Sequence, residues 1–368
     1  MIKINYPKHR KKFEEDYVAI FDIEKIKKEW EDEFKKIDYD ISENSIKKLL
    51  VLPFDELLKI YQDFTDNKSI KKNEDDKKTL YGHYQPEIAN FFMDYSKELN
   101  LKTCYFCNID FINVFATRFD NVEYKTVLDV IEAKNYDDLI LLKGIGPSIA
   151  NKIIANNINS MEDIEKISGQ GIKEENLKKI KNIDISKIDF KSQKNHFTLD
   201  HFLPKSKCPI LALSLYNFVP SCSSCNTKFK TVQNLEKEHL SPTSSSFSVQ
   251  DNIKFKFFFD TKVKKDDLNL LITYSKNEDK DYEKYIEAFE LENRYKFHQN
   301  EALALIKKQE KYSETRIDEI ANILKISPHQ VKKDIFGEEL FNGDIQDKSF
   351  TKMKRDVAKN IGIKGVKE

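Results

Sequence analysis

The sequence lacks several features that would assign it to a familiar class. It has no apolar run long enough to span a membrane and no signal peptide, and its 62 basic and 62 acidic residues leave no net charge. We therefore expect neither a membrane partner nor a protein that coats nucleic acid through an overall positive charge, and we expect a cytoplasmic location. A GxxxxGK[ST] phosphate loop is also missing, so any use of ATP would depend on another protein.

Cysteine is scarce, but its placement is informative. Four of the 5 cysteines form two Cys-x-x-Cys pairs, Cys104 with Cys107 and Cys222 with Cys225. A Cys-x-x-Cys turn points two sulfurs at one ion, so two such turns predict a tetrahedral structural Zn²⁺ site. Disulfides and redox-active pairs are the alternatives, and the expected reducing compartment disfavours disulfides. We expect the remaining thiol, Cys208, to be a small apolar filler.

An acid, an imidazole and two carboxamides accompany the cysteine pairs. Asp200 and His201 belong to the segment HFTLDHFLPKS, and Asn217 and Asn226 belong to NFVPSCSSCNTKFK. Imidazole titrates near neutral pH, so His201 is suited to deprotonate water, and the side-chain carbonyl of Asn217 could hold one of its ring N–H groups. Asp200 and Asn226 offer the oxygen ligands that Mg²⁺ or Mn²⁺ prefers. Each asparagine could equally be a cap of a turn or a helix.

These segments resemble the HNH family, the ββα-metal endonucleases with a zinc-binding frame. The family pattern reads C-x-x-C, then D-H-hydrophobic-hydrophobic-P, then N-hydrophobic-x-x-x-C-x-x-C-N-x-x-K, and the two segments match its later parts. The resemblance implies that His201 is the catalytic base and that Asn217 and Asn226 occupy the next two signature positions. It also implies two strands, a helix that starts near Ser223, and one catalytic Mg²⁺ or Mn²⁺ held by Asp200 and Asn226.

The first cysteine pair is separated from the rest of the pattern by a long insertion. Within it, DLILLKGIGPSIANKII (138–154) places Gly144, Ile145 and Gly146 between two apolar-periodic segments. This stretch resembles a helix-hairpin-helix motif, whose glycine turn presents backbone N–H groups to a DNA phosphate. These three residues and Lys152 are therefore candidate DNA contacts. A weaker copy follows at 160–180; a purely structural hairpin and a protein-binding hairpin are the alternatives.

Three lysines near the pattern are further candidates for phosphate contact: Lys205, Lys228 and Lys230. They lie in a locally basic stretch, 191–235, which would steer DNA to one site by a salt-sensitive attraction. Solvated lysines in a lysine-rich chain are the simpler alternative.

The fold class that we expect is α+β and predominantly helical, in four parts. Residues 253–260 and 268–274 read as paired strands, and most of the remaining segments have helical periodicity. The four parts are a helical N-terminal region (1–100), a zinc-stapled HNH core split into 101–133 and 186–240, the helix-hairpin-helix insertion (134–185) and a C-terminal strand-helix region (241–368).

Together these features predict an HNH endonuclease that hydrolyses double-stranded DNA with a divalent ion. The terminal arms resemble, in outline, those of HNH proteins from bacterial defence systems, which implies an anti-phage role with a partner ATPase. A restriction-like or RNA-cleaving nuclease is one alternative, and a catalytically idle zinc module that binds DNA is another. The oligomeric state, the sequence preference and the activating signal are not predicted.

Overall fold

The computed structural model describes residues 1–35, 40–66, 79–116, 124–142, 144–160, 162–164, 180–185, 188, 193–230, 235–259, 268–274 and 279–367. The chain divides into two compact units. The first combines Met1–Val114 with Asn195–Glu368, and the second is Phe115–Lys194. Each unit has an apolar core of its own.

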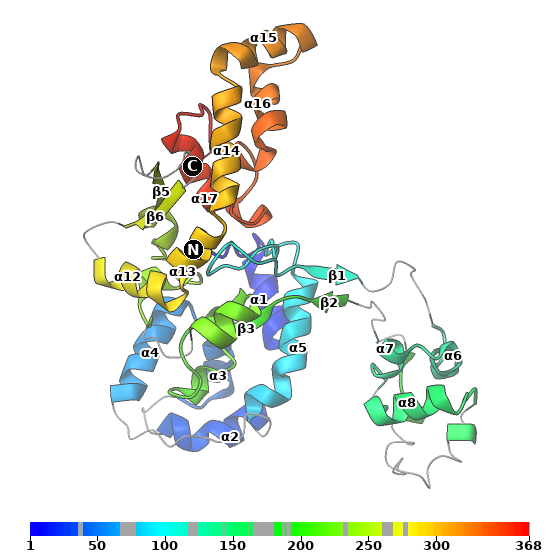
Figure 1. Cartoon of the computed structure of the whole chain (residues 1–368). Coiled ribbons are helices and arrows are strands. Elements are labelled where there is room, and N and C mark those ends of the chain that lie inside the picture. The colour runs from blue at the N-terminus through cyan, green and yellow to red at the C-terminus, as the bar shows by residue number, and fades with distance from the viewer. Residues whose placement is uncertain are drawn as a thin grey trace. The chain divides into compact units, whose positions relative to one another are not determined.

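The described residues of the N-terminal part of the first unit form five helices (Figure 1): α1 (Arg10–Val18), α2 (Ile23–Lys35), α3 (Glu43–Leu50), α4 (Phe54–Asp66) and α5 (Leu80–Asp94). In α2, the side chains of Ile26, Trp30 and Phe34 recur every four residues and are buried, as expected for the inner stripe of an amphipathic helix. Ser42 and Thr79 cap α3 and α5 by accepting backbone N–H bonds, so these two helix starts are defined locally.

A short hairpin and a helical turn follow the second unit along the chain. Strands β3 (Thr198–His201) and β4 (Phe218–Ser221) pair antiparallel, with His201 opposite Phe218. The connection between them contains the short helices η4 (Pro209–Leu211) and η5 (Leu215–Asn217), and η6 (Ser224–Phe229) follows β4 as a π-helix. The order strand, strand, helix is the one expected from the sequence, and the helix begins one residue later than Ser223.

The C-terminal part of the first unit mixes one hairpin with helices. Its elements are η7 (Glu238–Leu240), α11 (Val249–Asn252), β5 (Lys254–Phe259), β6 (Leu268–Thr273), α12 (Asp279–Ala288), α13 (Leu291–Phe297), α14 (Gln299–Lys311), α15 (Glu314–Leu324), α16 (Pro328–Phe336), η9 (Glu338–Leu340), η10 (Ile345–Asp347) and α17 (Thr351–Asn360). The strands expected at 253–260 and 268–274 are present as the antiparallel pair β5–β6. The carboxylate of Asp356 accepts from the Phe255 amide at 3.0 Å and ties α17 to β5.

The described part of the second unit contains α6 (Val127–Ala133), α7 (Tyr136–Leu139) and α8 (Pro147–Ala155). Strands β1 (Val114–Ala116) and β2 (Gln193–Asn195) pair where the chain enters and leaves this unit. The expected second hairpin copy at 160–180 lies largely outside the described residues. The α+β, mostly helical class is confirmed by these elements. No helix within the described ranges is both long enough and apolar enough to cross a bilayer.

Candidate metal centre and catalytic site

The four paired cysteines meet in one buried cluster. Their Sγ atoms all lie within 4.8 Å of one another, and those of Cys107 and Cys222 are 4.0 Å apart. A tetrahedral ion with metal–sulfur bonds of about 2.3 Å holds its sulfurs about 3.8 Å apart, so only small shifts are needed to close the shell. The thiols are not joined in disulfides. The cluster could therefore hold a metal ion such as zinc.

Backbone amides already point at the sulfurs. The amide of Cys222 donates to the sulfur of Cys104 at 3.3 Å, and the amide of Ile109 donates to that of Cys107 at 3.4 Å. Such N–H···S bonds stabilise thiolates. The bond from Ile109 arises from the local turn after Cys107, whereas the bond from Cys222 joins the two cysteine pairs and depends on the tertiary structure.

The ionisation of the cluster also fits a bound cation. Burial raises the pKa of Cys225, and the neighbouring thiols raise it further. Burial acts in the same direction on Cys107, but hydrogen bonds from the other thiols and the charge of Arg294 outweigh it and lower the pKa of Cys107. Four buried thiols cannot all ionise at this separation unless a cation compensates their charge.

Arg294, from α13, was not among the predicted site residues. Its guanidinium donates to the sulfurs of Cys225 at 3.3 Å and Cys107 at 3.4 Å. Burial would lower the pKa of Arg294, but these sulfurs outweigh burial and raise it. Four thiolates around a divalent cation would retain a net negative charge, and the positive charge of Arg294 offsets part of it. The sequence could have indicated this role by the position of Arg294, a basic residue between Leu291 and Tyr295, which are both buried in the core.

Three of the predicted catalytic and phosphate-binding residues line one open cavity beside α5 and β3. His201, Asn226 and Lys205 lie on its wall, and the cavity has a volume of about 540 Å³. The ammonium of Lys205 lies 4.6 Å from the centre of the Tyr81 ring, which α5 contributes. An imidazole, a carboxamide and a cation therefore share a solvent-accessible space.

The imidazole of His201 is oriented by a backbone carbonyl. Its Nε2 lies 2.9 Å from the carbonyl oxygen of Ala212, and its ring centre lies 4.5 Å from that of Tyr81. In the tautomer whose Nε2–H donates to this carbonyl, Nδ1 carries the lone pair. The arrangement meets the requirement expected of a base, although its partner is Ala212 and not the predicted Asn217.

Asn217 has a different task, which is to shape the connection between β3 and β4. It is fully buried, and its Oδ1 accepts from the amide of Leu203 at 2.7 Å. Its Nδ2 donates to the carbonyl oxygens of Leu203 and Leu211, each at 3.1 Å. These three bonds fix the loop that presents the Ala212 carbonyl to His201, so Asn217 positions the histidine indirectly.

Asp200 and Lys230 form a buried ion pair and do not line the cavity. Neighbouring strand residues point to opposite faces, so Asp200 lies on the inner side of β3, where it is 6% exposed. The ammonium of Lys230 donates to its carboxylate and to the carbonyl oxygens of His201, at 2.6 Å, and Phe202, at 3.3 Å. This placement corrects one expectation, since the buried Lys230 is no surface phosphate contact. A shared ion between Asp200 and Asn226 stays a prediction. Lys228 is exposed on η6.

The glycine turn of the insertion agrees with only part of what the sequence predicted. Gly144 adopts φ 106°, a conformation that favours glycine, and Gly146 is the N-cap of α8. Ile145 is 3% exposed and belongs to the core of the second unit, so its predicted DNA contact could come only from its backbone. Lys152 is half-buried on α8. The turn is thus built as expected, and a DNA contact there remains a prediction.

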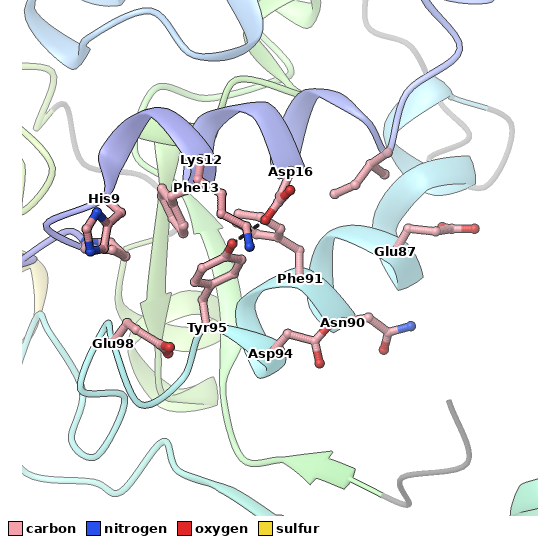
Figure 2. A pocket seen from close by; sticks show the side chains of 12 residues that line it. His9, Lys12, Phe13, Asp16, Glu87, Asn90, Phe91, Asp94, Tyr95 and Glu98 are labelled. Carbon is pink, nitrogen blue, oxygen red and sulfur yellow. Dashed lines mark hydrogen bonds between the residues drawn. The ribbon is translucent and has the colours of Figure 1, made fainter. Parts of the chain in front are cut away.

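A larger cavity, of about 700 Å³, lies between α1 and α5 and contains none of the predicted residues (Figure 2). Phe13 and Phe91 line it, and the hydroxyl of Tyr95 donates to Asp16 at 2.5 Å. Its remaining carboxylates belong to Glu87, Asp94 and Glu98. Their negative charge would repel a phosphate backbone, so this cavity does not extend the candidate site.

Comparison with known proteins found no family model, no curated protein and no solved structure that matches this chain. The assignment of a function therefore depends on the residues of the site and their geometry.

Proposed function

We propose that this protein is an endonuclease of the HNH type, which hydrolyses phosphodiester bonds in DNA and holds a structural Zn²⁺ in its cysteine cluster. One observation carries the proposal. The strand–strand–helix segment, which contributes Cys222 and Cys225 to the four-cysteine cluster, brings His201 and Asn226 to the same open cavity.

One position of the helix departs from the family pattern. The HNH pattern has a lysine three positions after the asparagine, whereas here Phe229 has that position and Lys230 follows it. The segment Ser224–Phe229 is a π-helix, in which each turn holds more residues than in an α-helix. The wider turn accommodates the additional residue and lets Lys230 reach Asp200 beneath β3.

In this proposal, His201 removes the proton from an attacking water through Nδ1, while Nε2–H stays on the Ala212 carbonyl. Positioned general bases of this kind contribute about 10²–10⁴-fold to a rate. Lys205 places a positive charge on the same wall of the cavity, where it would contact the scissile phosphate.

The described residues do not by themselves fit the catalytic ion that the resemblance implies. The lining of the cavity supplies an imidazole and carboxamides, whereas Mg²⁺ and Mn²⁺ prefer sets that include a carboxylate. The nearest predicted carboxylate, Asp200, is held by Lys230. We therefore assign no step to an ion at Asp200. The cleavage assay described next measures whether the reaction requires a divalent ion.

The test is cleavage of a supercoiled plasmid, with Mg²⁺ and with Mn²⁺, by the wild type, His201→Ala and His196→Ala. His196 is a matched control because it is exposed on the same segment and does not line the cavity. We expect cleavage by the wild type and by His196→Ala, and a loss of about 10²-fold or more in His201→Ala with an unchanged zinc content. Equal cleavage by both variants would refute the role of His201.

Two further outcomes address the alternatives. Cleavage of an RNA transcript without cleavage of plasmid would change the substrate class, and absence of cleavage of either would favour an idle zinc module. A role in anti-phage defence with an ATPase partner is proposed from the resemblance alone. Phage plating on cells that express the wild type or His201→Ala with the neighbouring genes would test it, and equal plating efficiency would reject it.

A further inference from the structure

The cavity between α1 and α5 is walled on one side by a continuous helical stripe (Figure 2). The residues that α5 and the turn after it contribute are Glu87, Asn90, Phe91, Asp94, Tyr95 and Glu98. They recur at intervals of three and four residues, which places them on one face of the helix. The part within α5, from Glu87 to Asp94, spans about 10 Å at about 1.5 Å per residue. The cavity therefore runs along the helix for at least two turns.

Three aromatic rings in mutual contact form the apolar floor of this cavity. The ring centre of Phe13, from α1, lies 5.0 Å from that of Phe91 and 4.8 Å from that of Tyr95, and the last two are 4.9 Å apart. Phe13 and Phe91 are buried, whereas Tyr95 is half-buried and stands at the surface of the cavity. The hydrogen bond from the Tyr95 hydroxyl to Asp16 fixes this ring between the two helices (Figure 2). A floor that is fixed before binding lowers the entropic cost of docking.

The charge of the lining is predominantly negative. Every charged residue that α5 and its following turn contribute to the cavity is acidic, namely Glu87, Asp94 and Glu98. The α1 side adds the carboxylate of Asp16, the ammonium of Lys12 and the imidazole of His9. Four carboxylates thus outnumber one ammonium, and the excess lies along the α5 wall. Charge complementarity requires a group that docks against this wall to be cationic.

The shape of the cavity favours a helix as its occupant. The described residues that line it belong to helices and their flanking turns, so an extended peptide could not add to them as a further strand. Recognition must come from side chains, as where an amphipathic helix lies in an apolar groove. A volume of about 700 Å³ is in the range that buries several anchoring groups. A small free cation would satisfy the carboxylates but would leave the aromatic floor uncovered, whereas an amphipathic helix with basic residues satisfies both.

We propose that the cavity between α1 and α5 is a docking site for a basic amphipathic helix of a partner protein. The apolar residues of that helix pack on Tyr95 and the rings beneath it, and its lysines or arginines pair with Glu87, Asp94 and Glu98. The inference goes beyond the proposed function and does not depend on it, because this cavity shares no lining residue with the cavity of His201. A second copy of this chain is the competing occupant.

The probe is a pair of designed peptides of about 15 residues with the same leucines at helical spacing. One peptide has lysine at its polar positions, and its twin has glutamate there. Fluorescence anisotropy would measure the binding of each labelled peptide to the full-length wild type, to Glu87→Lys and to Glu319→Lys. Glu319 is the matched control because it is exposed on α15 and does not line the cavity, so both variants change the charge of the protein equally.

A second pair of variants tests the space without changing the charge. Asn90→Trp places a large ring in the cavity, and its matched control is Asn322→Trp, since Asn322 is also exposed on a helix and lies outside the lining. Circular dichroism of all four variants would show that each is folded. Light scattering after size-exclusion chromatography would measure the oligomeric state of the wild type and of Glu87→Lys.

We expect Glu87→Lys and Asn90→Trp to raise the Kd for the lysine peptide about fivefold or more, with both controls within about twofold of the wild type. The glutamate twin should bind the wild type about tenfold more weakly or worse. Equal binding of the two peptides, equal effects within either variant pair, or no saturable binding to the wild type would overturn the proposal. A dimer that Glu87→Lys dissociates would assign the cavity to a second copy and would also overturn it.

Discussion

Replacing Asp200 with asparagine should strongly destabilise the first unit, because it leaves the ammonium of Lys230 without its counter-charge. The side chains of the pair are each only 8% exposed. After the substitution, the ammonium retains the carbonyl oxygens of His201 and Phe202, which carry only partial charge. Removal of one partner of a buried ion pair costs about 3–5 kcal/mol.

In the folded Asp200→Asn variant, Lys230 can avoid being a buried, uncompensated cation only by losing its proton. From an ordinary pKa of about 10.4, neutralisation at about pH 7 costs about 4.6 kcal/mol, which sets an upper limit. Burial lowers the pKa of Lys230 and Asp200 opposes this, so in the variant the pKa falls further and the actual cost is smaller. We expect a loss of about 3–4 kcal/mol, a large share of the roughly 5–15 kcal/mol that stabilises a typical domain.

The assay is unfolding in guanidinium chloride, followed by the fluorescence of the single tryptophan, Trp30, which is buried in α2 of the same unit. The second arm of a double-mutant cycle is Lys230→Met. Burial raises the pKa of Asp200 and lowers that of Lys230 despite their attraction, so desolvation outweighs the pairing. The double variant should therefore lose less than the sum of the single losses, with a coupling of about 2 kcal/mol or more.

Two results would refute this reasoning. Asp200→Asn could unfold at the same denaturant concentration as the wild type, or the single losses could simply add in the double variant. A variant of wild-type stability that no longer cleaves DNA would instead favour the role of Asp200 as a metal ligand, which the sequence suggested. The sign of the pH dependence is a further check. In Asp200→Asn the folded state holds Lys230 with a depressed pKa, so stability should rise with pH toward the ordinary lysine pKa.

Three further predictions concern other parts of the protein. Cys222→Ser should lose the bound zinc, since one of four sulfurs is removed, and a full complement by elemental analysis would contradict the ligand assignment. Gly146→Val should weaken duplex binding while circular dichroism stays unchanged, because no atom lies within 4 Å of an added Cβ; unchanged binding would give the turn a structural role. Burial lowers the pKa of Lys352 to about 8, so the folded state releases this proton before the unfolded chain does. The stability of the wild type should therefore rise by about 3 kcal/mol between about pH 8 and about pH 10.4, and thermal melts of Lys352→Met should lack this rise.

Several features followed from the sequence because they depend on neighbouring residues. A Cys-x-x-Cys turn directs two sulfurs to one side whatever surrounds it, so the approach of Cys104 to Cys107 and of Cys222 to Cys225 could be predicted from spacing. The meeting of the two pairs was predicted from the four ligands that zinc requires, and only the tertiary structure achieves it. The strands of β5–β6 and the helical stripe of α2 follow in the same way from the period of their apolar residues. The placement of His201 on a strand before a second strand and a helix was implied by the family resemblance, and the structure has these three elements in that order.

The tertiary structure decided the tasks of the polar residues around these features. The sequence places Asp200 beside His201, but the burial of the inner face of β3 separates their side chains and pairs Asp200 with Lys230. The partner of the imidazole is a backbone carbonyl of Ala212, whose position depends on the three bonds of Asn217. Arg294 reaches the sulfurs across a large separation in sequence. Local spacing determines which way a side chain leaves the backbone, whereas its partner and its solvation depend on chain segments that only the folded protein brings together.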